Sequence, residues 1–491
     1  MREGGGHIFF FDVSIDGAIA REPRAVITDK EFIEREIYRF KISKRRRDMM
    51  DGERYYAGLH NILARQRTVI GDDGQPMVID NLPNNRIVDN QYRKMVNQKA
   101  NYLLGQPLTF QGDNARYLEA LDQVFNKRFL RMMKNLAKDA LNEGLGWLLL
   151  TYDENGELTF RKFKAHEIIP GWRDADHTAL DYAIRVYSIV SYAGADERVI
   201  EKVEVYDEAG IHYFVLDGTH IVPDQPHHAS YFMVNDRHPC NWSRIPLIPF
   251  KRDAEETPLI RCVKSLQDGL NAILSNFQNN MEEDARNTIL ILVNYDGENL
   301  GEFRRNLATY GAVKVKTVDG AAGDLRTLQV EVNAENYKAI LELFKKAIIE
   351  NAMGYDAKDD RLRGNANQLN IQSMYSDIDL DANEMETEFQ AAFEDLLWFV
   401  NCHLSNVGVG DFERDRVEVI FNRDMLINEG EVIGNIRTSV GILSDETLVA
   451  NHPWVDDVQA ELSLVKKQRE AEMADGYLNS FDPKVGERDG A

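Results

Sequence analysis

The stretch that decides the fold is NNRIVDNQYRKMVNQKANYLLGQPLTF, residues 84–110. Apolar side chains recur through it at helical spacing and leave a face of Asn, Gln, Lys and Arg, which predicts an amphipathic helix. The apolar positions are Ile87, Tyr92, Met95, Val96, Ala100 and Leu103. We expect Gly105 to end this helix in the left-handed conformation, and Pro107 prevents the helix from continuing.

The composition is that of a globular protein with an acidic surface. The chain has 491 residues, of which 43% are hydrophobic and 28% are charged, and its formal net charge is -23. Its length predicts two to four domains. The negative charge disfavours a conventional tight DNA-binding protein, because phosphate would be repelled, but it suits an acidic passage through which DNA slides. A soluble acidic protein whose charge carries no functional message is the alternative.

Cysteine usage and hydropathy restrict the compartment. Cys240, Cys262 and Cys402 are far apart and form no CxxC pair, which excludes a disulfide framework and favours a reducing compartment. No apolar run approaches the ~18 residues needed to span a bilayer. We therefore expect an intracellular protein during synthesis.

The first half of the chain predicts helices followed by strands. Residues 1–30 read as an arm or strand, and residues 114–144 read as helical. The period then changes to that of an antiparallel meander. Its strands are expected at Gly146–Thr151, Leu158–Lys164, Tyr182–Val190, Val199–Tyr206, His212–Leu216 and Tyr231–Val234.

Helices return after residue 257 with an apolar seam. Six apolar residues step by four or three positions, which predicts a helix packed among neighbours. This apolar seam consists of Leu259, Val263, Leu266, Leu270, Ile273 and Phe277. We place the polar residues Lys264, Gln267, Asp268, Asn271, Asn279 and Asn280 on the far side of this helix.

A small α/β insert follows the seam helix. A second helix starts near Asn333 and stops at Gly354. The polar stretch Tyr355–Asn370 reads as a mobile loop. Gly354, just before this loop, and Gly364, within it, permit movement. A long helix is expected at Ile371–Leu404 and a strand at Val417–Phe421. The insert comprises strands at Thr288–Asn294, Ala312–Val318 and Leu325–Val330 and a short helix at Asn299–Leu307. The chain after Glu429 is helical, with Ser444 capping one helix.

Three motifs and the order of elements resemble the portal proteins of tailed bacteriophages, in particular the type found in siphophages of Gram-positive hosts. The motifs are Tyr55-Tyr56-Ala57-Gly58, the helix that ends Tyr102-Leu103-Leu104-Gly105-Gln106-Pro107, and Gly441-Ile442-Leu443-Ser444-Asp445-Glu446-Thr447. The family commonly shows a Ser-Gly pair where this chain has Gly364-Asn365-Ala366-Asn367. That difference bears on where the mobile loop ends and the long helix begins, and not on the resemblance itself.

The resemblance implies an α+β, ring-forming portal-type fold with wing, stem, clip and crown regions. Residues 1–257 would form the N-terminal arm and wing, 258–286 the first stem helix, 287–333 the clip and 334–354 the second stem helix. Residues 355–370 would form the tunnel loop, 371–428 the long helix and strand that return to the wing, 429–475 the helical crown, and 476–491 a disordered tail.

The resemblance also implies a structural, non-enzymatic function without a cofactor or metal. About twelve subunits would form a ring at the capsid vertex, through which double-stranded DNA is packaged and ejected without sequence specificity. Its partners would be the terminase large subunit, a head-completion adaptor, and the major capsid and scaffolding proteins, with no membrane. The protein would be located in the virion, after assembly in the host cytoplasm. The implied DNA contacts of the tunnel loop are Lys358, Arg361, Arg363, Asn365 and Asn367.

Catalytic motifs are missing, and two other functions stay open. The sequence contains no GxxxxGK[ST], HExxH or GxSxG. His166-Glu167 and His227-His228 are isolated pairs; a two-His zinc or copper site at the latter is the alternative to a loop pair.

A metal-dependent nuclease could use the densest acidic set, Asp377, Asp379, Asp381 and Glu384, although an acidic solvated segment is the better interpretation. A helix-turn-helix DNA-binding protein could use Glu429–Ala450. The second helix of that unit, Asp445–Asn451, holds two acids and no Lys or Arg, which argues against DNA reading.

Overall fold

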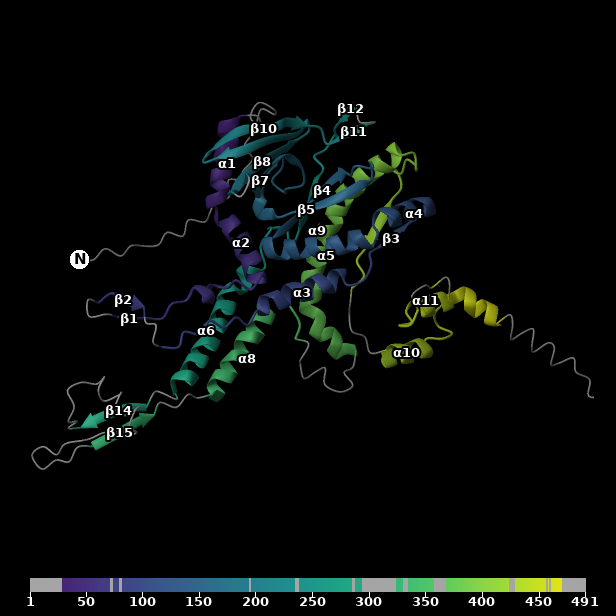
Figure 1. Cartoon of the computed structure of the whole chain (residues 1–491). Helices are drawn as coiled ribbons and strands as arrows, with labels where there is room; N and C mark the ends of the chain where they lie inside the picture. The colour runs from purple at the N-terminus through teal and green to yellow at the C-terminus, as the bar shows by residue number, and fades with distance from the viewer. Residues whose placement is uncertain are drawn as a thin grey trace, which may run out of the picture. The chain divides into compact units, whose positions relative to one another are not determined.

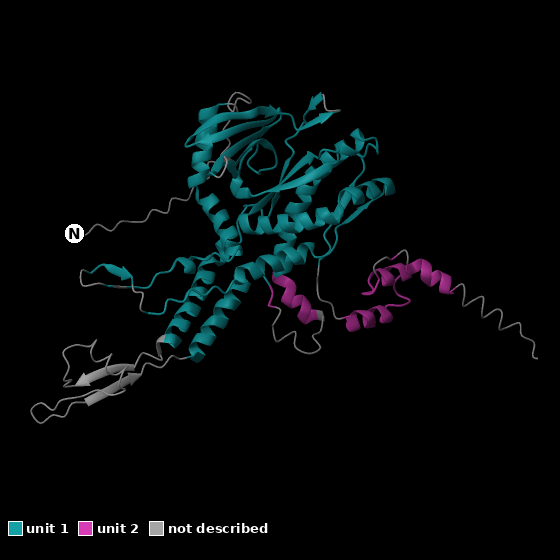
Figure 2. Cartoon of the chain, in the orientation of Figure 1, with its two compact units in different colours: residues 1–354, 378–424 teal, residues 355–377, 425–491 magenta. Residues whose placement is uncertain are grey.

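The computed structural model describes residues 29–70, 74–78, 82–193, 196–234, 238–284, 288–293, 324–329, 334–356, 368–423, 429–455, 458 and 461–469. Figure 2 shows the two compact units into which the chain divides. Unit 1 comprises Met1–Gly354 and Ile378–Asp424, and unit 2 comprises Tyr355–Asp377 and Met425–Ala491. The mixture of helices and antiparallel strands confirms the α+β class.

Unit 1 begins with helices that alternate with short connections. They are α1 (Lys30–Ile42), α2 (Lys44–Tyr56), α3 (Gln91–Leu104), α4 (Ala115–Val124) and α5 (Lys127–Glu143), with a 3-10 turn at Asn61–Ala64. The helical prediction for residues 114–144 is confirmed, and the structure divides the region into α4 and α5, because the Asn126 side chain accepts hydrogen bonds from Arg128 N and Phe129 N and starts α5.

The prediction for the opening stretch is wrong about where its helix starts and about the conformation of Gly105, but the helix does end at Gly105 as predicted. The helix begins at Gln91, where Asn90 is the N-cap, so Ile87 lies before the helix, outside regular secondary structure. Gly105 has φ -66° and is not left-handed. Pro107 accounts for the helix end, because a proline disfavours the helical conformation of the residue before it.

The strand-rich region forms two antiparallel sheets. A three-stranded sheet has the order β13 (Leu247–Lys251), β4 (Leu145–Tyr152) and β5 (Leu158–Phe163). A five-stranded sheet has the order β10 (His220–Ala229), β9 (Gly210–Asp217), β8 (Asp196–Asp207), β7 (Leu180–Ala193) and β6 (Ile168–Trp172). The meander is therefore confirmed in the larger sheet, with β6, β10 and β13 as unpredicted strands; a 3-10 turn at Ala165–Glu167 precedes β6.

Four short two-stranded ladders complete the described strands. They are β1 (Thr68–Ile70) with β2 (Pro76–Val78), β11 (Phe232–Val234) with β12 (His238–Cys240), β14 (Thr288–Val293) with β15 (Asp324–Gln329), and β16 (Val417–Ile420) with β3 (Thr109–Gly112). Of the predicted insert, Ala312–Val318 and Asn299–Leu307 lie outside the described residues.

Two apolar cores hold unit 1 together. The larger core includes Leu136 of α5, Trp147 of β4, Phe250 of β13 and Phe393, all at most 1% exposed. In the smaller core, α1 covers the five-stranded sheet through residues such as Ile33. Burial of side chains of this size contributes roughly 1.5–3 kcal/mol each.

Three long helices follow the sheets. They are α6 (Ile260–Asp284), α8 (Ala334–Asn351) and the 39-residue α9 (Gln368–Asn406). Figure 1 shows α6 and α8 side by side. The two helices are antiparallel, because Gly269 contacts Phe344 and the later Phe277 contacts the earlier Tyr337. A Cβ atom at Gly269 would lie 2.5 Å from the Phe344 ring, so only glycine permits this approach. The rings of Phe277 and Tyr337 lie 4.9 Å apart further along the pair.

Unit 2 contains α10 (Glu429–Thr438) and α11 (Asp445–Ala450). The turn between them passes through Gly441, whose φ of 85° favours glycine. Ser444 Oγ accepts a hydrogen bond from Thr447 N at 3.2 Å, which confirms the predicted N-cap. Among the helices of the described ranges, none has both the length and the apolar character that a membrane span requires.

Candidate functional site

A ladder of buried polar side chains runs along α6. Gln267, Asn271, Ser275 and Asn279 repeat every four residues, and each is at most 3% exposed. The sequence places Gln267, Asn271 and Asn279 on a polar side of this helix, and the structure adds that these side chains face other parts of the chain and not solvent. We call these four residues the polar ladder.

The polar ladder binds the backbone of the segment that precedes α3. Asn279 Oδ1 accepts from Asn85 N at 2.7 Å, and Ser275 Oγ accepts from Ile87 N at 2.9 Å. The next two rungs lie closer to α3: Asn271 Oδ1 accepts from Asp89 N at 3.0 Å, and Gln267 Oε1 accepts from Tyr92 N at 3.0 Å. Three backbone N–H groups outside regular secondary structure and one in the first turn of α3 thus obtain buried partners.

The Tyr55-Tyr56-Ala57-Gly58 block is attached to the same helices. Tyr55 Oη donates to Asp268 Oδ1 of α6 at 2.5 Å, and burial together with this contact raises the pKa of Tyr55. Tyr56 Oη donates to Asn97 Oδ1 of α3 at 2.9 Å. Gly58 has φ 89° and turns the chain after α2. The motif therefore connects α2 to α3 and α6.

His60 closes the network around Asn271. Asn271 Nδ2 lies 2.8 Å from His60 Nδ1, and His60 Nε2 lies 3.0 Å from Tyr55 O. Burial lowers the pKa of His60. The neutral ring with its proton on Nε2 satisfies both contacts, since Nδ1 then accepts and Nε2 donates.

A buried ion cluster holds the C-terminal end of α8. Lys99 of α3 is 3% exposed, and its Nζ donates to Met353 O at 3.0 Å and pairs with Asp381 Oδ2 of α9 at 2.6 Å. Arg252 also contacts Asp381, at 3.2 Å. Burial lowers the pKa of Lys99, while the Asp381 carboxylate opposes that shift. A cation beside the last carbonyls also stabilises a helix end.

Gly354 has a packing role at this junction. A Cβ atom there would lie 2.7 Å from Met95 Sδ and 2.9 Å from Gln98 Oε1. The absence of a side chain therefore lets the chain leave α8 in contact with α3. Sequence reasoning assigned Gly354 to loop movement and did not detect this contact.

The predicted DNA contacts Lys358, Arg361, Arg363, Asn365 and Asn367 lie outside the described residues. The apolar seam of α6 does lie among the residues that the structure describes. Leu259, Val263 and Leu270 are fully buried in the larger core of their own subunit. Leu266, Ile273 and Phe277 are half-buried. The resemblance to portal proteins implies that a stem helix packs through such a seam against a neighbouring subunit, and this contact stays a prediction.

Two of the four residues in the acidic set predicted for a nuclease, Asp379 and Asp381, are engaged in ion pairs. Asp379 pairs with Arg423 and accepts from Tyr102 Oη at 3.0 Å, and Asp381 is buried in the ion cluster. Within the described residues, no group of three or more His, Cys, Asp or Glu side chains could hold a metal ion. The interpretation of this set as a solvated segment is thus wrong for Asp381.

The loop position predicted for the histidine pair is wrong, whereas the two helices predicted for the helix-turn-helix are present. His227 and His228 lie on strand β10, not in a loop, and His166 Nδ1 lies 3.1 Å from Glu143 Oε2. Unit 2 does contain two helices joined by a turn, but α11 is six residues long and starts with Asp445 and Glu446. The short length of α11 and its two acidic residues both argue against sequence-specific contact with DNA.

Three comparisons bear on the family. The model of the family "Phage portal protein, SPP1 Gp6-like" matches residues 38–475. The portal protein of Bacillus phage SPP1 is 29% identical over 452 residues, which cover 90% of this chain and 87% of that protein. The portal protein of Clostridium phage phiCD119 is 30% identical over 450 residues, which cover 89% of this chain and 96% of that protein.

Among solved structures, one similar chain comes from the neck of a native GTA particle computed with C12 symmetry. The two chains are 13% identical with a TM-score of 0.40, and the match covers 73% of this chain and 88% of that chain. Because the family model matches most of the chain, and because both curated relatives are portal proteins, this chain belongs to the SPP1 Gp6-like family of phage portal proteins, whose role is structural and not enzymatic.

Proposed function

We propose that this chain forms a ring of about twelve copies around a DNA channel at the capsid vertex. The observation that carries the proposal is the pairing of α6 with α8, which leaves an apolar strip on α8. Ile340 is 42% exposed and Leu343 is 65% exposed on this helix. Cyclic rings repeat one such lateral contact between neighbouring copies, so an exposed apolar strip on a rigid helix pair suits a subunit interface.

The order of the helices and strands supports an assignment of the portal regions that the family resemblance implies. In this proposal α6 and α8 are the stem helices, and residues 287–333, which contain β14 and β15, are the clip. The sheets and the N-terminal helices form the wing, α9 and β16 return the chain to the wing, and α10 and α11 belong to the crown. The polar ladder then serves to attach the stem to the wing, because it joins α6 to the segment before α3.

The partners belong to the same proposal. The clip meets the terminase large subunit during packaging and a head-completion adaptor afterwards, while the outer parts of the ring meet the major capsid and scaffolding proteins. Residues 355–370 form the tunnel loop, where Lys358, Arg361 and Arg363 make brief phosphate contacts that salt screens. The ring is then located in the virion, after its assembly in the host cytoplasm.

The first test is the native mass of the purified chain by light scattering, with negative-stain images of the same fraction. Twelve copies of the 56.2 kDa chain give roughly 670 kDa, and a central hole should be visible. A monomer or dimer at every salt concentration and protein concentration would contradict the ring.

A further inference from the structure

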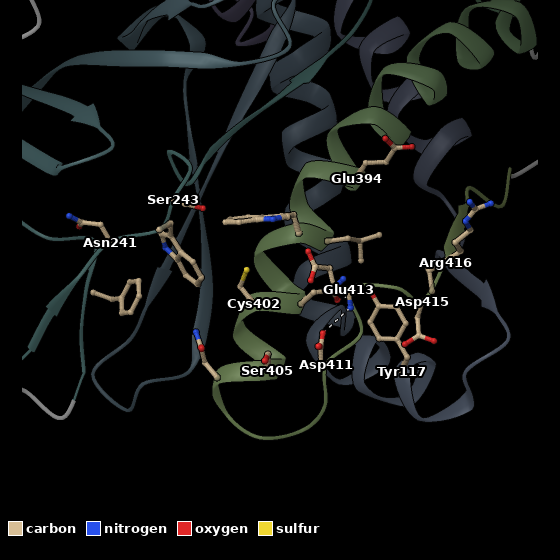
Figure 3. Close-up of a pocket in the computed structure, with 17 residues that line it drawn as sticks. Tyr117, Asn241, Ser243, Glu394, Cys402, Ser405, Asp411, Glu413, Asp415 and Arg416 are labelled. Atoms are coloured by element: carbon tan, nitrogen blue, oxygen red, sulfur yellow. Dashed lines mark hydrogen bonds between the residues drawn. The ribbon is translucent and has the colours of Figure 1, made fainter. Parts of the chain in front are cut away.

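A hollow of about 880 Å³ opens in unit 1 beside the C-terminal part of α9. It lies away from α6, α8 and the polar ladder, and the portal assignment gives it no role. Figure 3 shows the residues around it, which come from α4, α9, the region of β11 and β12, and the connection between α9 and β16. Its volume lies within the range of protein ligand sites.

The inner wall of the hollow is aromatic. Trp242 is 5% exposed, and its ring lies 4.9 Å from that of Phe232 and 5.4 Å from that of Phe399. Tyr117 stacks on Phe412 at 4.6 Å. These contacts fix the wall in position, so an apolar side chain that enters meets a preformed surface.

The rim of the hollow is acidic. Glu394 lies on α9, and Asp411, Glu413 and Asp415 lie on the connection to β16, where Arg416 is the cation of the lining. None of these four carboxylates has an ion-pair partner within 4.0 Å among the residues that the structure describes. Figure 3 shows Asp411 and Glu413 joined by the hydrogen bond from Glu413 N to Asp411 Oδ1, at 3.2 Å. The rim therefore carries unneutralised negative charge.

The chain itself shows which group suits this site. Trp398 lines the hollow, and the guanidinium of Arg244 lies 4.6 Å from the centre of its ring. The same guanidinium contacts Asp395 Oδ1 at 3.3 Å. A cation placed over an indole beside a carboxylate is a favourable combination. The empty part of the hollow offers the same two kinds of group, aromatic rings and carboxylates.

We propose that this acidic hollow binds a basic segment of another polypeptide, in which Lys or Arg residues flank one aromatic or branched apolar side chain. The apolar side chain enters against Trp242 and Trp398, and the flanking cations contact the rim carboxylates. A second copy of this chain is a poor occupant because it carries a net charge of -23. DNA is a worse one, since its phosphates would meet the same carboxylates.

The test uses the full chain and a fluorescein-labelled peptide with a central Trp between Lys-Arg pairs, with fluorescence anisotropy as the measurement. One comparison peptide replaces Trp by Ala, and a second replaces the cations by Glu. We expect the basic Trp peptide to bind, the Ala peptide to bind about tenfold more weakly, and the acidic peptide not to bind. Equal binding of the basic and acidic peptides would overturn the proposal.

Variants locate the binding in the hollow. Asp411→Asn with Glu413→Gln should weaken the basic peptide about fivefold at low salt, as expected for two exposed ion pairs, and the difference should shrink as salt is raised. The matched control, Asp122→Asn with Glu154→Gln, removes the same charge from exposed positions outside the hollow and should bind as wild type does. Equal weakening by both double variants would overturn the proposal.

Two further measurements complete the test. Ser405→Trp fills the hollow from an exposed position and should abolish peptide binding without a change in unfolding temperature. Wild-type affinity in this variant would contradict the proposal. The Asp411→Asn, Glu413→Gln variant should keep the native mass of the wild type; a lower mass would mean that a second copy occupies the hollow, which would also overturn it.

Discussion

The side-chain oxygen of Asn271 accepts a hydrogen bond from the backbone N–H of Asp89 at 3.0 Å, and the polar ladder repeats this relationship along α6. Four helical residues rise about 6 Å, and two extended residues advance about 6.6 Å. Every fourth helix position therefore meets every second peptide N–H, as Ser275 and Asn279 do with Ile87 and Asn85. A helix and a segment without regular structure are thus fixed in register.

Replacing Asn271 by Ala should lower the free energy of unfolding by about 2 kcal/mol. The substitution leaves the part-buried N–H of Asp89 and the buried Nδ1 atom of His60 without their partner. Denaturant unfolding followed by circular dichroism measures the change. Asn351→Ala is the control, because the Asn351 amide is exposed and, among the residues that the structure describes, its hydrogen bond is to Ala347 O of its own helix. A loss no larger than in this control would show that the polar ladder contributes little.

The polar ladder also shows what the sequence can and cannot predict. The spacing of Leu259, Val263 and Leu270 predicted a packed helix, and α6 confirms it. The same spacing of Gln267 and Asn271 is typical of a solvated face, since nothing local tells that a distant segment will cover it. A buried polar row is recognisable only once its partner, residues 85–92, is known.

The unpredicted strands have a different cause. Pro223 and Pro226 in β10, and Pro249 in β13, read as turn signals because proline lacks a backbone N–H for a ladder. Both strands lie at the edge of their sheets, where an unpaired side tolerates proline. The ion cluster could not be predicted from the sequence, because Lys99 and Asp381 are far apart in the chain and only the fold brings them together. The same reason applies to the polar ladder.

The pH dependence of stability should report on Glu256, a carboxyl group that is 4% exposed. Burial alone would raise its pKa, but the hydrogen bond to His177 at 2.7 Å and the charges of Arg45 and Lys251 outweigh burial and lower the pKa. The carboxylate therefore stabilises the fold above its unfolded pKa of about 4.3, and this contribution is lost as the pH falls through the lower folded value.

Glu256→Gln should consequently reduce the free energy of unfolding by about 3 kcal/mol at pH 7, because Arg45 and Lys251 lose a buried partner. The difference from wild type should shrink below about pH 4.3. Denaturant titrations at several pH values measure both effects. Glu255→Gln, at an exposed neighbouring position, should change little at any pH. A difference that stays constant down to acid pH would argue against the pairing of Glu256.

The two apolar positions Leu343 and Leu270 separate assembly from folding. Leu343→Asp places a charge on the exposed strip of α8, so the variant should unfold at the wild-type temperature but lose the ring mass in light scattering. Leu270→Asp buries an unpaired charge at a position that is 0% exposed, so the subunit itself should lose about 4 kcal/mol.

The control for assembly is Lys338→Asp, which adds negative charge to an exposed position on the opposite side of α8. We expect it to keep the ring mass. Rings that persist in the Leu343→Asp variant, or that disappear equally in the Lys338→Asp variant, would remove α8 from the subunit interface.

The proposed tunnel loop should affect DNA without affecting assembly. Changing Lys358, Arg361 and Arg363 together to Gln, or deleting part of Asp359–Asn367, should leave the native mass unchanged but reduce the nuclease-protected DNA in assembled particles. The physical reason is that removing three cations weakens brief phosphate contacts, while the aspartates of the loop continue to repel the duplex.

A triple variant of exposed cations on α5, Lys127, Arg128 and Arg131 to Gln, removes the same charge from another surface and should package DNA as the wild type does. Normal packaging by the loop variants would mean that residues 355–370 do not line the channel. A loss of ring mass would instead give the loop a role in subunit contact, since DNA is absent from the purified ring. The two measurements therefore separate a DNA contact from an assembly contact at the same residues.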